Sequence, residues 1–196
     1  MVQKHYKEIN SAYYSTITDP KNSNELNIKK LIASQSIILS LVGIPGIYIH
    51  SLFGTKNFLK GVEDTGQKRT INREKLQYDK LKVNLANINS REYKIFTEFM
   101  RLINNRKSEK AFHPKGKQEV LFLKKELFSL LRISPDGKDR IIALHNITDN
   151  IQELDLIKNQ YNLNKKQYYD IISEKTINIE KILLKPFQIM WLKVFK

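Results

Sequence analysis

The stretch GIPGIYIHSLFGTKN, residues 43–57, decides how the first half of the chain is interpreted. Its run from Ile44 to His50 is apolar, rich in β-branched residues and bounded by glycine and proline. That composition predicts a strand buried on both faces, as in a parallel sheet. Before it, apolar residues recur at helical spacing from about Glu25 to Leu41, which predicts a helix that Gly43 ends.

The segments after this predicted strand complete an alternating pattern. Residues 54–78 are polar and aperiodic and predict a long loop. A second helix is predicted from Arg91 to about Lys107, because its apolar residues form one stripe. The order helix, buried strand, loop, helix is typical of a (β/α) barrel or a doubly wound sheet.

The hydrophobic period changes after His113 and Pro114. Apolar runs of strand length follow at residues 118–123, 127–134, 140–148, 168–172, 177–183 and 187–195. The turn signal Ser-Pro-Asp-Gly at 134–137 separates two of them. The sequence therefore predicts α/β structure over residues 1–113 and a small all-β domain over residues 114–196.

The composition is globular and strongly basic. The chain has 196 residues, a net charge of +14 and no cysteine, which excludes disulfides, a thiolate nucleophile and Cys-ligated zinc. Its 27 Lys outnumber seven Arg and are spread along the chain, beside many Ile and Asn, as a genome rich in A and T would produce. We therefore expect a solvated basic surface and no nucleic-acid partner.

One segment raises the alternative of a membrane span. Residues 31–49 carry no charge, but serines, Gln35, glycines and Pro45 interrupt them. A buried helix followed by a buried strand is the favoured interpretation, and a single-pass membrane protein stays the less favoured one. The polar N-terminus has no signal-peptide pattern, so we expect a cytoplasmic protein without a membrane partner.

Few residues suit catalysis or ligand binding by pattern alone. The four His have no metal-ligand spacing, and His145 on a predicted strand reads as a hydrogen-bonded structural residue. Arg69, Asn72 and Arg73 lie within five positions, and arginine can donate a fork of hydrogen bonds to hydroxyls, a carboxylate or a phosphate. A solvated basic loop explains the same three residues equally well.

Several segments together resemble the sucrose phosphorylase group of the α-amylase superfamily. They are GIPGIYIHSLFGTKN, the pattern TG-x-x-R-x-INR from Thr65 to Arg73, and AFHP at 111–114. Within that group, the form that these motifs take in this chain resembles the glucosylglycerate or sucrose-6-phosphate phosphorylase branch. EINSAYYS at 8–15 is similar to the exit of that group's acceptor loop, and SPDGKDRIIALHNIT at 134–148 to a strand pair of its C-terminal β domain.

The resemblance implies a fold and a reaction. The fold is the C-terminal remnant of a (β/α)8 barrel, with Ile44 to His50 as its eighth strand, followed by a small antiparallel β domain. The reaction is a double displacement in which an Asp nucleophile, a Glu acid/base and a second Asp transfer glucose to phosphate with retention. Sugar and phosphate are the implied substrates, and no metal or organic cofactor is expected.

The chain departs from the family in its carboxylates. Those three residues precede the eighth strand, where this chain holds only Glu8, Asp19 and Glu25, none in a catalytic motif. We therefore expect no catalytic residue in the chain and no activity of the chain alone. Three explanations stay open: the product of a frameshifted or decaying gene, one half of a split enzyme whose N-terminal partner chain completes the barrel, or an incomplete gene. A noncatalytic module that binds carbohydrate or protein is the alternative.

The resemblance assigns substrate-binding roles to five positions. Arg69 matches the arginine that holds the glucosyl 4-hydroxyl at the pocket floor. Glu8 falls where the acceptor loop presents a side chain to the leaving group. Asn72 and Arg73 are expected to shape the loop, and His50, at the end of the predicted strand, to line or support the pocket.

Overall fold

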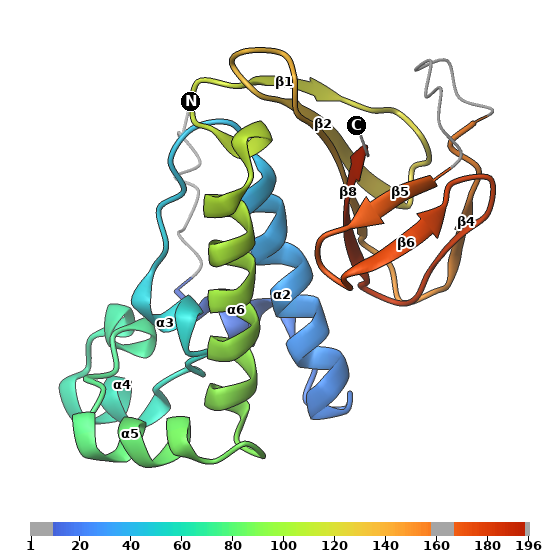
Figure 1. Ribbon diagram of the computed structural model, residues 1–196. Coiled ribbons are helices and arrows are strands. Elements are labelled where there is room, and N and C mark those ends of the chain that lie inside the picture. Colours follow the sequence, from blue (N-terminus) through green and yellow to red (C-terminus); the bar gives the residue numbers. More distant parts are fainter. Residues whose placement is uncertain (1–9, 158–166, 195–196) are drawn as a thin grey trace, which may run out of the picture. The chain divides into compact units, whose positions relative to one another are not determined.

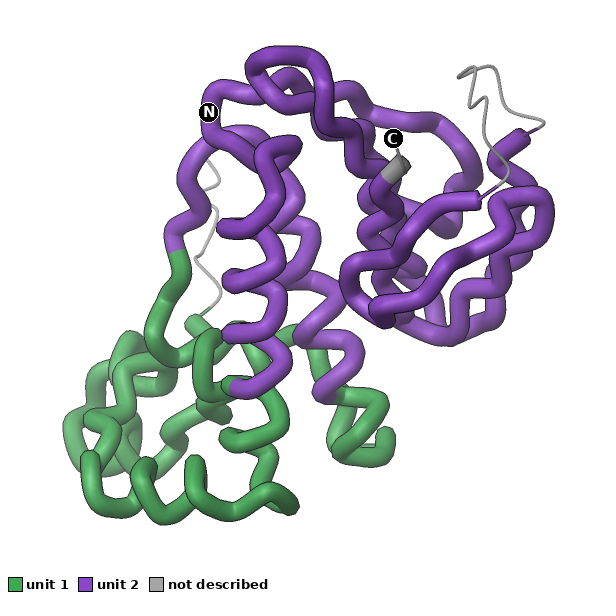
Figure 2. The backbone as a smooth tube through the Cα atoms, in the orientation of Figure 1, with its two compact units in different colours: residues 1–27, 47–96 green, residues 28–46, 97–196 purple. Residues whose placement is uncertain are grey.

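The computed structural model describes residues 10–157 and 167–194. The chain divides into two compact units (Figure 2). The first unit contains residues 47–96 and the described residues up to Asn27, and the second contains residues 28–46 and everything described from Thr97 onward. Each unit is described by itself.

The first unit consists of short helices. They are α1 (Tyr13–Ile17), α3 (Ile49–Leu52), α4 (Leu59–Thr65), the 3-10 helix η1 (Lys68–Asn72) and α5 (Tyr78–Ala86) (Figure 1). The prediction of a loop over residues 54–78 was therefore wrong, because α4 and η1 lie within it. Gly66, at φ 67°, ends α4, and its N–H donates a local hydrogen bond to the Val62 carbonyl at 2.8 Å.

The core of the first unit surrounds Ile95, which is fully buried. Gly54 adopts φ +58°, and a Cβ there would lie 2.2 Å from Ile95 Cδ1. The Phe53 ring stacks on Phe96 with 5.5 Å between centroids. A Cβ at position 54 would force Ile95 Cδ1 to move and would strain the backbone at this positive φ, so glycine is favoured here.

The predicted strand from Ile44 to His50 is wrong. Residues 44–48 have no regular secondary structure, and α3 begins at Ile49. Ile44 is 86% exposed and Tyr48 53% exposed, the opposite of a strand buried on both faces. A strand forms by pairing with neighbours, and no strand in the described part of the chain pairs with this segment.

The two long helices agree with the prediction. α2 spans Asn24–Ser40 and α6 spans Arg91–Ser108. In the second unit, Arg106 of α6 donates hydrogen bonds to the carbonyl of Leu39, in the last turn of α2, and to those of Leu41 and Gly43, just beyond the helix. These bonds satisfy orphan acceptors of the helix C-terminus, where a positive charge is also favourable.

The second unit contains a six-stranded antiparallel sheet in the order β1-β2-β3-β8-β5-β6. The strands are β1 (Lys117–Val120), β2 (Leu127–Ile133), β3 (Arg140–Asn146), β5 (Gln167–Asp170), β6 (Lys175–Asn178) and β8 (Ile189–Val194). A second sheet pairs β4 (Gln152–Leu154) with β7 (Ile182–Leu184). The predicted antiparallel strands are confirmed, although the run 177–183 divides between β6 and β7.

One face of these sheets encloses an apolar core. Its members are buried side chains of six strands (β2, β3, β4, β5, β7 and β8) and of residues that flank the strands: Leu121, Leu127, Ile142, Leu144, Leu154, Leu156, Tyr168, Ile179, Ile182, Leu184, Met190 and Leu192. Burial of this size supplies the main folding free energy of a small β domain. All of these core residues lie between positions 121 and 192, within the second unit.

Two buried polar groups join elements of the second unit. Arg132 of β2 is fully buried and donates to the carbonyls of Ser40, His113 and Lys117. Asp170 at the end of β5 accepts bonds from the backbone of Ile172, Ser173 and Trp191. Each group is satisfied by main-chain partners, as buried polar groups require.

The uncharged segment 31–49 does not form a single helix. It contains the end of α2 and the irregular stretch before α3. Among the described residues, no helix combines the length and the apolar character needed to cross a membrane.

Candidate functional site

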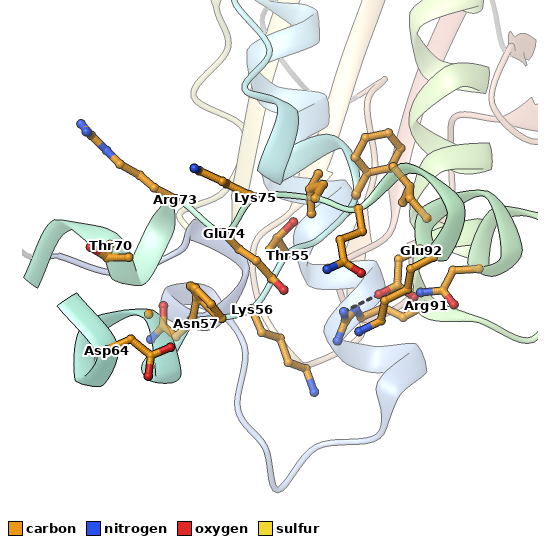
Figure 3. Close-up of a pocket in the computed structure, with 18 of the residues that line it drawn as sticks. Thr55, Lys56, Asn57, Asp64, Thr70, Arg73, Glu74, Lys75, Arg91 and Glu92 are labelled. Atoms are coloured by element: carbon orange, nitrogen blue, oxygen red, sulfur yellow. Dashed lines mark hydrogen bonds and ion pairs between the residues drawn. The ribbon is translucent and has the colours of Figure 1, made fainter. Parts of the chain in front are cut away.

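The first unit contains a pocket of about 640 Å³ (Figure 3). Its walls come from the segment after α3, from α4 and η1, from the linker 73–77, from α5 and from the start of α6. This volume lies in the range of small-molecule sites. The helices α4 and η1, which the loop prediction missed, contribute Gly61, Asp64, Thr65 and Thr70 to the pocket wall.

Backbone contacts explain why these segments converge. Thr55 donates to the His50 carbonyl at 2.9 Å, and Phe58 donates to the Ile71 carbonyl at 2.8 Å. Gly61 lets α4 approach the Phe58 ring, because a Cβ at this position would lie 2.2 Å from Phe58 Cδ1. The pocket wall thus depends on a close contact that only glycine permits.

The pocket lining is rich in charge. The cations are Lys56, Arg73, Lys75, Lys80 and Arg91, and the carboxylates are Asp64, Glu74 and Glu92. Arg91 and Glu92 neutralise each other, with Nη2 2.6 Å from Oε1. Asp64 lies 3.9 Å from Lys60, which is outside the lining. The remaining lining side chains give the pocket an excess of positive charge.

The structure places the predicted arginines and asparagine around the 3-10 helix. Arg69 is exposed in η1 and does not line the pocket, whereas Arg73 does. The Asn72 carbonyl accepts a bond from the Tyr48 hydroxyl at 3.2 Å, and Asn72 Nδ2 donates to the Ser11 carbonyl at 3.5 Å. Asn72 therefore ties η1 to segments on either side of it.

His50 lies in α3 and is 8% exposed. Its ring centroid is 5.0 Å from that of Tyr48, and Nδ1 has no hydrogen-bond partner among the described residues. Burial lowers the pKa of His50, and the nearby Glu74 carboxylate opposes that shift by favouring the imidazolium. The neutral imidazole retains a ring nitrogen that can still form a hydrogen bond.

Glu8 lies outside the described residues. The structure thus brings Asn72 and Arg73 of the predicted set to one region with Tyr48, and leaves Arg69 facing solvent. Within residues 10–157 and 167–194, no cluster of three or more His, Asp or Glu suits a metal ion.

Sequence reasoning missed several lining residues. Lys56, Glu74, Lys75, Lys80 and Arg91 meet only after α4, η1 and α5 have folded. Lys56 lies inside the stretch 43–57 and Glu74 directly follows the pattern that ends at Arg73, but nothing in their spacing set them apart from other charged loop residues. α5 carries no buried residue, so it gave no apolar periodicity to predict it.

No protein-family model matches the chain. It is 40% identical over 146 residues to a glucosylglycerate phosphorylase of Spirochaeta thermophila, covering 74% of this chain and 25% of that protein. It is 32% identical over 186 residues to a glucosylglycerate phosphorylase of Escherichia coli, covering 95% of this chain and 32% of that protein.

A solved structure shows the fold relationship. The α-amylase of Geobacillus thermoleovorans matches with a TM-score of 0.68 at 13% identity, covering 95% of this chain and 37% of that protein. The chain spans about a quarter to a third of the length of the curated relatives it matches. The resemblance drawn from the motifs is therefore confirmed: the chain is a homologue of the C-terminal part of glucosylglycerate phosphorylases.

Proposed function

We propose that the chain is the C-terminal portion of a retaining glycoside phosphorylase that moves a glucosyl unit from an α-glucoside to phosphate. The observation that carries the proposal is the 40% identity to a glucosylglycerate phosphorylase over 146 residues. The names of the relatives favour glucosylglycerate as the glucoside. In this proposal the catalytic carboxylates belong to the rest of the barrel, and the chain is inactive alone.

The exposed apolar segment supports a barrel remnant. Ile44, Ile47, Tyr48 and Ile49 are each at least 36% exposed, in a stretch whose composition favours a buried strand. Pairing with strands of another polypeptide would cover these side chains and satisfy the free backbone groups. In this proposal an N-terminal partner chain supplies the barrel strands that cover this segment.

The expected domain division stays part of the proposal. Residues 1–113 would belong to the barrel and residues 114–196 would form the C-terminal β domain. Limited proteolysis of the chain tests this division: a fragment that begins near Gly116 should survive longest. Survival of an N-terminal fragment with loss of the C-terminal part would contradict it.

The proposed substrate contacts follow from the residue chemistry. The Arg69 guanidinium would donate to the glucosyl 4-hydroxyl, far from the reacting carbon, so it positions the sugar and moves no proton. Asn72 would hold η1 in place, Arg73 would shape the same loop, and His50 would support the pocket. Glu8 would face the leaving group.

Complementation tests the proposal directly. The chain is mixed with the remaining N-terminal part of the Spirochaeta thermophila relative, and α-glucose 1-phosphate is measured with glucosylglycerate and phosphate. We expect product only when both polypeptides are present. Turnover by the homogeneous chain alone would contradict the absence of catalytic carboxylates, and no turnover by a stable complex of the two would contradict the proposal itself.

The role of Arg69 is tested in the same complex. Arg69→Ala should lower kcat/KM about tenfold to a hundredfold, because one charge-assisted hydrogen bond is lost. Arg69→Lys should not restore activity, since an ammonium cannot reproduce the planar fork. Lys68→Ala, at the adjacent exposed position, is the matched control. Activity of Arg69→Ala within twofold of the parent would show a solvated residue.

A further inference from the structure

Asn57, on the pocket wall of the first unit (Figure 3), bonds to a segment that lies 45 positions earlier in the chain. Its Oδ1 accepts the Ala12 N–H at 2.6 Å and the Ser11 hydroxyl at 3.2 Å. Its own backbone N–H donates to the Ser15 hydroxyl oxygen at 2.9 Å. One residue therefore binds both ends of the segment 11–15.

The segment 11–15 needs such an external partner. Its helix, α1, has five residues, and a helix of that length is not stable by itself in water. Ala12 precedes the first helical turn, so its N–H has no acceptor within α1. Because Ala12 is only 2% exposed, loss of the Asn57 oxygen would leave a buried donor without a partner.

The residue that follows Asn57 holds the 3-10 helix η1. The Phe58 N–H donates to the Ile71 carbonyl at 2.8 Å, and Asn72 Nδ2 reaches back to the Ser11 carbonyl at 3.5 Å. These contacts close a ring of three segments, residues 11–15, 57–58 and 71–72. In such a network, a displacement of one segment disturbs the bonds of the other two.

We propose that Asn57 is a positioning residue: by clamping residues 11–15 to the pocket wall, it fixes η1, the helix that carries Arg69. This rests on the proposed function, in which the Arg69 guanidinium donates to the sugar, and adds a residue outside the expected substrate-binding set. Asn57 acts only through the placement of Arg69. A donor displaced by about 1 Å loses most of its contribution to a positioned substrate.

Two substitutions separate the hydrogen bonds of Asn57 from its packing. Asn57→Leu keeps the branched shape and removes the acceptor, whereas Asn57→Asp keeps an oxygen that can accept both bonds. Within the described residues, Asn57 Nδ2 donates no hydrogen bond, so the Asp variant loses no partner. Asn87→Leu is the matched control, because Asn87 is exposed in the same unit and accepts a local bond from the Asn89 N–H.

Amide hydrogen exchange of the full chain, followed residue by residue by NMR, is the first test. Asn57→Leu should accelerate exchange at Ala12 about tenfold or more, because the acceptor of its N–H is lost. Exchange at Thr70 and Arg73, whose N–H groups form bonds within η1, should accelerate as well. Asn57→Asp and Asn87→Leu should resemble the parent. Unchanged exchange in the β sheet shows that every variant folds.

Three results of the exchange experiment would overturn the proposal. Unchanged exchange at Ala12 in Asn57→Leu would remove the clamp. Equal acceleration in Asn57→Asp and Asn57→Leu would assign the effect to something other than the accepted bonds. Acceleration at Ala12 without any change at Thr70 and Arg73 would remove the link to η1. None of these results requires turnover, so they are distinct from a failure of the proposed function.

A double-variant cycle in the complementing complex is the second test. Asn57→Leu should lower kcat/KM about tenfold in the parent and less than about twofold when Arg69→Ala is already present. A residue with a merely structural role would lower kcat/KM by the same factor in both backgrounds, and that result would overturn the positioning role. If the parent complex gives no turnover, the proposed function has failed, and the exchange at η1 alone decides the role of Asn57.

Discussion

The β sheet of the second unit and the irregular segment 44–48 contain similar residues but differ completely in structure. In β3, Ile142, Ala143 and Leu144 are at most 1% exposed and pair on both sides with β2 and β8. In the irregular segment, Ile44 is 86% exposed and nothing in the described chain pairs with it. Composition makes a strand possible, and the neighbouring strand makes it form.

The largest expected effect concerns Trp191, the centre of the well-paired region. Trp191 is fully buried in β8 opposite Ala143, and its ring lies 4.6 Å from the Phe112 ring. Trp191→Ala should lower the free energy of unfolding by about 4 kcal/mol through lost contacts and a cavity. The free energy of unfolding is measured by urea denaturation with far-UV circular dichroism as the signal. Tryptophan fluorescence cannot be used, because the variant has no tryptophan left.

The control for Trp191 is an exposed apolar residue of the same unit. Ile151 is 65% exposed, so Ile151→Ala should change the free energy of unfolding by less than about 0.5 kcal/mol. Similar losses in both variants would mean that the sheet lacks the tight core described here.

The second effect is a pH dependence caused by His145, another residue of β3. His145 is fully buried, its Nδ1 lies 3.0 Å from the Phe128 carbonyl, and burial lowers its pKa to about 4. The unfolded chain therefore takes up the proton first as the pH falls. Stability is fully present above about pH 6.5 and is lost progressively toward pH 4, by about 3 kcal/mol in total.

His145→Gln isolates this contribution. Unfolding is measured from pH 8 to pH 4 in the parent and the variant, so that the titration of carboxylates cancels in the difference. The stability of the variant should decrease less over this range. Parallel curves for the two proteins would show that His145 does not titrate as its burial requires.

A third effect probes the first unit. Gly54→Ala should destabilise this unit by about 2 kcal/mol, from the positive φ and the clash with Ile95 Cδ1. Gly66→Ala is the matched control, because Gly66 has a similar φ of +67° and no atom within 4 Å of the added Cβ. It should cost about 1 kcal/mol, from backbone strain alone. Both are measured by urea denaturation.

The double variant Gly54→Ala with Ile95→Val removes the clashing atom. Its stability should exceed what the sum of the two single variants predicts. Strict additivity would mean that backbone strain, and not the contact with Ile95, explains the glycine.

The sequence predicted the elements that carry a regular apolar pattern or a turn signal within a short stretch of chain. The apolar stripe of α6 and the periodicity of α2 indicated both helices, and alternating runs with the 134–137 turn indicated the antiparallel strands. α5 was missed because it has no buried face. The strand at 44–50 was predicted wrongly because pairing is a property of the partner, which composition does not report.

The candidate site was less predictable than the fold. Arg73 was named and does line the pocket, whereas Arg69 was named and is exposed. Lys56, Lys75 and Lys80 come from three different segments, and their proximity results from the folding of α4, η1 and α5. In a chain with 27 lysines, no local signal distinguishes those three from the others.

The smallest expected effect sharpens the contrast between the sheet and the segment 44–48. In the chain alone, Ile44→Ser should change the free energy of unfolding by less than about 0.5 kcal/mol, because the side chain is already in water. In the proposed complex with the N-terminal part of a relative, the same side chain would be covered by that polypeptide. There Ile44→Ser should weaken the complex about tenfold or more, as the loss of a buried aliphatic side chain predicts.

Calorimetric titration of one polypeptide into the other measures the affinity of the parent and of the variant. Ile88→Ser is the control, because Ile88 is 65% exposed. If Ile44→Ser destabilised the chain alone and left the affinity of the complex unchanged, the segment would be an ordinary surface loop and the barrel assignment would be lost.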